Sequence, residues 1–123
     1  DYVNNPHYVA LSESSYYTDA INLMINNGVN NFLVLSDDVE MAQTCISNID
    51  FKSGANFSFS GSNCVVSDFR LMANSRFIIT ANSTLSYVAS RLGTEKLVCQ
   101  PKKWMKNFEF KVAGNSGSEI HVL

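Results

Sequence analysis

Residues 77–93, FIITANSTLSYVASRLG, join an apolar strand pattern directly to a helix pattern. The run 77–80 is short, apolar and β-branched, which is typical of a strand covered on both faces in a parallel sheet. Residues 83–92 continue with helical periodicity, and Gly93 is the usual kind of residue to end a helix. This stretch therefore predicts a strand and helix joined by a short turn in an α/β fold.

The same order of strand and helix recurs along the chain. Helical spacing of apolar residues predicts helices over 16–25, 39–47, 67–74 and 83–92, and apolar runs predict strands over 32–35, 77–80 and 96–99. Residues 57–60 alternate as in a half-buried strand. We predict a Rossmann-like parallel sheet with helices on both faces, formed by right-handed βαβ units. One domain over 1–123 is expected, with an N-terminal loop at 1–11 and no clear element in the tail at 107–123.

Length and composition are those of one ordinary globular domain. The 123 residues are 46% hydrophobic and 16% charged, which excludes the disordered class. The apolar runs are far shorter than the roughly 20 residues of a membrane span, and the N-terminus has no basic leader, so we expect a cytoplasmic protein. Cys45, Cys64 and Cys99 are an odd number without a CxxC pair, which predicts reduced, buried thiols and no zinc site.

The charges are divided between the two halves of the chain. Residues 1–68 hold one Lys against eight acids, whereas residues 69–123 hold eight Lys or Arg against three acids. The second half is therefore expected to attract an anion. A nucleic-acid surface would be more basic and more aromatic, so we predict a smaller phosphorylated ligand and no nucleic acid. Lys102 and Lys103 are either phosphate contacts or ordinary solvated surface.

Four polar side chains lie in and just after the turn that follows the strand at 77–80. They are Asn82, Ser83, Thr84 and Ser86. In open parallel sheets, ligands bind beyond the carboxyl ends of the strands, where the next helix points its unpaired N–H groups. These residues are therefore candidates to hold a pyrophosphate without glycines. Helix capping explains one of the four side chains, and the two interpretations stay equally open.

A second polar segment, SDD at 36–38, follows another predicted strand. Asp37 and Asp38 are expected to face the same cleft and to accept hydrogen bonds from a ribose or from the N–H groups of a base. The alternative is that Asp37 caps the next helix while Asp38 interacts with its dipole. A metal is poorly supported because no third acid accompanies the pair. Tyr87 and Trp104 either stack on a ligand ring or fill the core.

Four segments of the chain resemble the C-terminal half of glycosyltransferase family 11, the α-1,2-fucosyltransferases. In sequence order they are YYTDAI, FLVLSDD, DFRLMANSRFIITANSTLSYVASRLG and KLVCQPKKW, and the similarity runs from residue 1 to about 106. It implies the C-terminal, Rossmann-like domain of a two-domain GT-B enzyme. Such enzymes bind GDP-fucose and transfer fucose with inversion to O2 of a galactoside-containing glycan, with no cofactor or metal.

The resemblance also implies roles for particular residues. Asn82, Ser83, Thr84 and Ser86 match the phosphate motif for the nucleotide sugar, and Asp37 and Asp38 match an acidic motif that supports the nucleotide. The chain differs from the family at Leu85, Tyr87 and Val88, where relatives commonly carry an aromatic residue and paired tryptophans. The donor and acceptor pockets are expected to differ accordingly.

The start of the chain matches only the end of a further family motif, His-x-Arg-Arg-x-Asp-Tyr. Asp1 and Tyr2 are its last two residues, and Asp1 is the candidate general base. The arginine that neutralises the departing phosphate is then expected upstream. We expect a truncated fragment that binds donor with little or no turnover, from a bacterial parent that is cytoplasmic or peripheral to the inner membrane.

A phosphoacceptor receiver domain is the alternative class. It also carries an acidic pair after a strand (LVLSDD), a Thr-Ala after another (IITA) and a Lys near a proline (QPKK). Asp68, the candidate acceptor, precedes Thr80 by only twelve residues, too few for a helix and the next strand. A non-enzymatic interaction or nucleotide-binding module also stays open, although an interaction module leaves the hydroxyl-rich turn unexplained.

Overall fold

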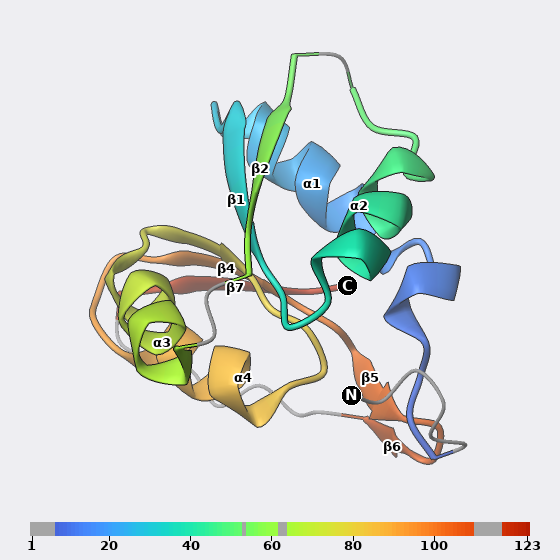
Figure 1. Cartoon of the computed structure of the whole chain (residues 1–123). Helices are drawn as coiled ribbons and strands as arrows, with labels where there is room; N and C mark the ends of the chain where they lie inside the picture. The colour runs from blue at the N-terminus through green and yellow to red at the C-terminus, as the bar shows by residue number, and fades with distance from the viewer. Residues whose placement is uncertain (1–6, 53, 62–63, 110–116) are drawn as a thin grey trace.

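The structure is a computed structural model of the chain (Figure 1), and it describes residues 7–52, 54–61, 64–109 and 117–123. After a short 3₁₀ turn, η1 (Leu11–Glu13), the helices are α1 (Tyr16–Asn26), α2 (Val39–Ser47), α3 (Val65–Asn74) and α4 (Thr84–Arg91). The strands are β1 (Asn31–Leu35), β2 (Asn56–Ser60), β3 (Phe77–Ile79), β4 (Leu97–Gln100), β5 (Lys103–Met105), β6 (Phe108–Glu109) and β7 (Glu119–Val122).

Parallel strands alternate with helices, which confirms the predicted Rossmann-like α/β class. β1 pairs with β2, and β3, β4 and β7 form a second sheet in that order, all in parallel. β5 and β6 form a small antiparallel hairpin. Among the described residues, no ladder joins β1 to β3. The predicted parallel layer is therefore divided into two hydrogen-bonded sheets.

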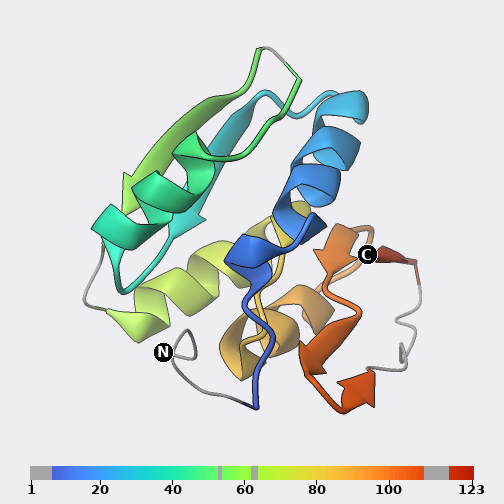
Figure 2. The same ribbon diagram turned by 90° about the vertical axis from the view of Figure 1, so that its right-hand side faces the viewer.

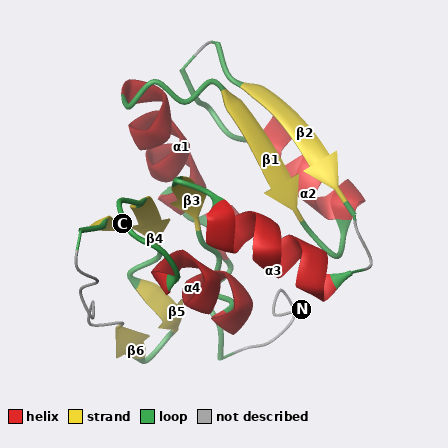
Figure 3. Ribbon diagram, turned by 90° about the vertical axis from the view of Figure 1, so that its left-hand side faces the viewer, coloured by secondary structure: helices red, strands yellow, loops and turns green. Residues whose placement is uncertain are grey.

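The three-stranded sheet is covered on both faces, as predicted. α1 lies on one side of it, while α3 and α4 lie together on the other (Figures 1 and 3). All four residues of the central strand, β4, are buried. The α1 residues Ala20 and Met24 pack with Leu97 and Cys99 of β4 in the main core. Burial on both faces explains why β4 is almost wholly apolar.

The β1-β2 sheet is covered less completely. Figure 2 shows α2 over one face, and Figure 3 shows the opposite face without a described helix in front of it. The inward side carries Phe32 and Phe57, whose rings stack with centroids 5.0 Å apart. The side chain of Leu33 is 51% exposed.

In the described part of the chain, no helix is long and apolar enough to cross a membrane.

The start of α3 and the strand β7 differ most from the sequence prediction. α3 begins at Val65 with Cys64 as its N-cap, two residues before the predicted start, so Ser67 lies in the first turn. Its hydroxyl hydrogen-bonds the Cys64 thiol. β7 lies in the tail where the sequence predicted no clear element. The sequence did not predict it because the strand depends on pairing with β4 and not on a strong local pattern. The predicted helix end at Gly93 is confirmed, and its φ of 85° is one that glycine adopts without strain.

The Tyr16 hydroxyl completes the end of the β3-β4 ladder. Thr80 N–H donates to Cys99 O at 2.9 Å. In a parallel ladder the next bond runs from the N–H of residue 101 to Thr80 O, but Pro101 has no N–H. The Tyr16 oxygen lies 2.6 Å from Thr80 O and 3.0 Å from Cys99 O, so it supplies the missing donor. α1 is thereby fixed to the carboxyl ends of β3 and β4.

Lys96 fixes the two helices on the other face of the sheet, α3 and α4, by hydrogen bonds to their backbone carbonyls. Its ammonium donates to Ala73 O at 2.6 Å and Met72 O at 3.2 Å in the last turn of α3, and to Ala89 O at 3.4 Å in the last turn of α4. The residue is only 5% exposed, and burial lowers its pKa. One cation thus donates to carbonyls at two helix C-termini, where the dipole favours positive charge, and Ala73 O has no other donor among the described residues.

Replacing Tyr16 by Phe is expected to lower the free energy of unfolding by about 1–3 kcal/mol, because Thr80 O is left buried without its donor. Tyr17→Phe is the matched control. The Tyr17 hydroxyl has no hydrogen bond within the described residues, and its burial raises the pKa of Tyr17 to about 12. Removing this hydroxyl should change stability by about 0.5 kcal/mol or less. Urea unfolding followed by circular dichroism measures both, and equal losses would contradict the assigned role of Tyr16.

The prediction that all three thiols are buried is wrong, because only Cys99 is buried and Cys64 is exposed. The three thiols are therefore expected to react with iodoacetamide in a fixed order. The Ser67 hydroxyl and first-turn backbone N–H groups lower the pKa of the exposed Cys64, so its thiolate is populated at a lower pH than that of an ordinary cysteine. Burial raises the pKa of Cys45, and it raises that of the fully buried Cys99 to about 12. At neutral pH, Cys64 should react about tenfold faster than Cys45, and Cys99 only after unfolding. Mass spectrometry of the native and urea-unfolded chain measures the order, and early labelling of Cys99 would contradict it.

Candidate functional site

The turn between β3 and α4 leaves a set of backbone donors free. Ser83 is the N-cap residue in an extended conformation, with no side-chain cap bond, and Tyr87 N–H donates to Ser83 O at 3.0 Å. Within the described residues, the N–H groups of Thr84, Leu85 and Ser86 have no hydrogen-bond partner. These are the orphan donors expected at the first turn of a helix, at the positive end of its dipole. An anion placed there would complete them.

The four polar side chains of this turn have different surroundings. The Asn82 amide donates to Val9 O at 2.9 Å. The Ser86 hydroxyl is nearly buried and lies 3.1 Å from Ser83 O and 3.4 Å from Ala81 O. Thr84 is exposed and Ser83 half-buried, and neither hydroxyl has a hydrogen bond among the residues described. Ser83 and Thr84 are therefore the hydroxyls of the predicted set that remain available to a ligand.

The two acids that follow β1 also differ from each other. Asp38 is the N-cap of α2, and its carboxylate accepts a hydrogen bond from Met41 N–H at 2.9 Å. This corrects the alternative in which Asp37 is the cap. Asp37 is exposed, and its carboxylate has no hydrogen bond or ion pair in the described part of the chain. Asp37 is thus the free carboxylate of the pair.

The acidic segment and the hydroxyl-rich turn each follow the carboxyl end of a parallel strand. However, β1 and β3 belong to different sheets, so no ladder places the two segments at one common edge. No hydrogen bond joins Asp37 or Asp38 to the turn among the described residues. The structure therefore brings Asn82, Ser83, Thr84 and Ser86 together by local geometry, while a shared site with the two acids stays a prediction. Asp1 lies outside the described residues.

The aromatic and basic candidates near the turn belong mainly to the protein's own packing. Trp104 is 7% exposed, and its ring meets that of Tyr87 edge-on at 5.6 Å, as expected for core filling. Lys102 and Lys103 are exposed and lie 3.9 and 3.7 Å from the Glu109 carboxylate. Surface pairs of this kind contribute little to stability. None of these contacts points to a ligand.

Sequence reasoning assigned no role to Arg91 or Gln100. Arg91 donates to the side-chain oxygen of the fully buried Gln100, and its guanidinium lies 4.6 Å from the centre of the Tyr87 ring. These contacts join α4, β4 and the aromatic pair. The bond from Arg91 to Gln100 depends on how α4 packs against β4, so no local pattern predicts it.

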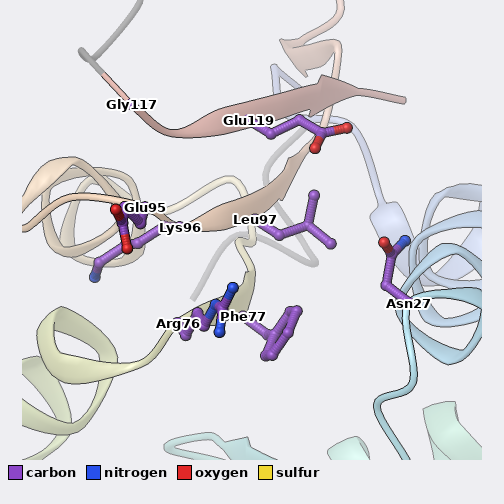
Figure 4. A pocket seen from close by; sticks show the side chains of 8 residues that line it. All are labelled: Asn27, Arg76, Phe77, Glu95, Lys96, Leu97, Gly117 and Glu119. Carbon is purple, nitrogen blue, oxygen red and sulfur yellow. The ribbon is translucent and has the colours of Figure 1, made fainter.

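An open hollow of about 520 Å³ lies at the opposite edge of the three-stranded sheet. Figure 4 shows Arg76 and Phe77 at the start of β3, Leu97 of β4 and Glu119 of β7 around this space. These residues stand at the amino ends of their strands. Ligands of open parallel sheets bind at the carboxyl ends, so the hollow is separate from the candidate site.

Comparison with known proteins gives one result that bears on identity. The family model described as glycosyl transferase family 11 matches residues 1–116. No curated protein and no solved structure matches the chain. The matched region contains both the hydroxyl-rich turn and the acidic segment, and it covers far more than half of the chain. The chain therefore belongs to glycosyltransferase family 11, the fucosyltransferase-type family that its sequence resembles.

Proposed function

We propose that this chain is the GDP-fucose-binding part of an inverting galactoside α-1,2-fucosyltransferase. The observation that carries the proposal is the start of α4. Three backbone N–H groups and the hydroxyls of Ser83 and Thr84 are without partners among the described residues of a chain that belongs to family 11. A nucleoside diphosphate is the part of the donor that suits such a set of donors.

The chemistry of the transfer explains why these groups are useful. The acceptor O2 attacks C1 of fucose as the C1–O bond to the diphosphate breaks, so negative charge develops on the departing GDP. Preorganised N–H groups stabilise such charge because they need little rearrangement during the reaction. In this proposal no metal is required, and Asp1 accepts the proton of the acceptor hydroxyl as general base.

The two acids take different parts in the proposed site. Asp38 is engaged by Met41 N–H, whereas the Asp37 carboxylate is exposed. We assign Asp37 to the nucleoside, where a carboxylate accepts hydrogen bonds from ribose hydroxyls or from base N–H groups. Asp38 then supports it indirectly by starting α2.

Thr84→Glu is expected to weaken GDP binding by about tenfold or more, because a carboxylate at the first position of α4 repels the diphosphate. The change suits the helix itself, since acidic residues are favourable in the first turn. Val65→Glu is the matched control. It makes a similar change at the first position of α3, where Val65 is 63% exposed.

Isothermal titration calorimetry measures the binding of GDP, and of ADP for comparison, to the chain and its variants. Each titration is done with and without EDTA. The proposal expects GDP to bind more tightly than ADP, EDTA to have no effect, and only Thr84→Glu to weaken binding. If Thr84→Glu and Val65→Glu weakened GDP binding equally, the β3-α4 turn would not be part of the binding site. A wild-type chain that fails to bind GDP would overturn the proposed function.

A further inference from the structure

The side chain of Asn82 holds the N-terminal segment of the chain. Its Nδ2 donates to Val9 O at 2.9 Å, across 73 positions of sequence. Residues 7–9 run antiparallel to β5, with a bridge between Tyr8 and Met105, and Lys106 N–H donates to His7 O at 3.0 Å. Figure 1 shows this segment beside β5. The Asn82 amide is thus used by the protein itself.

The Asn82 contact is one step in a closed chain of contacts around the start of α4. Val9 N–H donates to Trp104 O at 3.1 Å, so both backbone groups of Val9 are engaged. The Trp104 ring packs edge-on against Tyr87, and Tyr87 N–H returns to Ser83 O. Ser83 is adjacent to Asn82. These contacts therefore start and end in the β3-α4 turn, and the Asn82 amide is the side chain of the turn that takes part in them.

We infer that Asn82 is a positioning residue of the donor site: it anchors residues 7–9 beside the β3-α4 turn and so fixes the direction of the free amides of α4. The inference rests on the proposed function, and it separates Asn82 from the residues that contact the diphosphate. Backbone donors stabilise a developing charge only when they are held close to the required geometry. The Asn82 amide is suited to this task because it joins the turn to a second, already paired segment.

Hydrogen exchange tests the anchor without any ligand. In Asn82→Ala, amides in residues 7–11 and 82–87 should exchange about three- to tenfold faster, as expected when a neutral hydrogen bond is lost. Asn74→Ala is the matched control, because the Asn74 amide also donates to a backbone carbonyl, Arg70 O at 2.8 Å, but within α3. It should leave exchange in both segments unchanged. Asn82→Ser, which keeps a good turn residue but cannot reach Val9, is used if the alanine variant does not fold.

Titration of the same variants with GDP separates positioning from direct contact. Positioning predicts that Asn82→Ala or Asn82→Ser weakens GDP binding by about three- to tenfold together with the faster exchange. Weaker binding with unchanged exchange would make Asn82 a direct ligand and overturn the inference, as would faster exchange with unchanged affinity. A wild-type chain without GDP affinity would defeat the proposed function instead, and the exchange measurement would still decide whether Asn82 is the anchor.

Discussion

The hydrogen bond from the Tyr16 hydroxyl to Thr80 O is the contact on which the rest of the arrangement depends. Pro101 ends the β3-β4 ladder by removing one donor, and a buried carbonyl without a donor is costly. Tyr16 supplies that donor from α1, on the opposite side of the sheet from α4. The chain is then free to leave β3 through the turn that starts α4, and to leave β4 toward β5.

Positive charge compensates the helix dipole of α4 at its C-terminus, but no acidic residue does so at its N-terminus. The Lys96 ammonium donates to carbonyls in the last turns of α3 and α4. Arg91 adds a second positive charge to the last turn of α4. The negative end of the helix dipole is therefore compensated by the protein, while the positive end has no acidic residue in its first turn. A dipole of this kind contributes only about 0.3–1 kcal/mol at an exposed site. In the proposed site, affinity for a diphosphate would then come mainly from hydrogen bonds to the free N–H groups.

The sequence predicted those features that depend on nearby residues. The bounds of α2 and the end of α4 follow from apolar spacing and from Gly93, which acts within one or two turns. The division of the parallel strands into two sheets, the pairing of β7 with β4 and the bond from Asn82 to Val9 depend on residues far apart in the chain. Local patterns carry no signal for such contacts. The choice of Asp38 over Asp37 as the cap of α2 was also beyond reach, because both are favourable cap residues and backbone conformation decides between them.

A cluster of polar residues at a strand-to-helix turn has two tasks, and the structure separates them. A turn that ends a buried strand must satisfy its own carbonyls and hold neighbouring segments, and here Asn82 and Ser86 do so. Binding needs donors that remain free, and these are Ser83, Thr84 and three backbone N–H groups. Sequence identifies the cluster but not this division, because the same residue types serve both tasks. The proposed phosphate site is built mainly on backbone donors, so it needs no glycine where the side chains of the turn leave the N–H groups open.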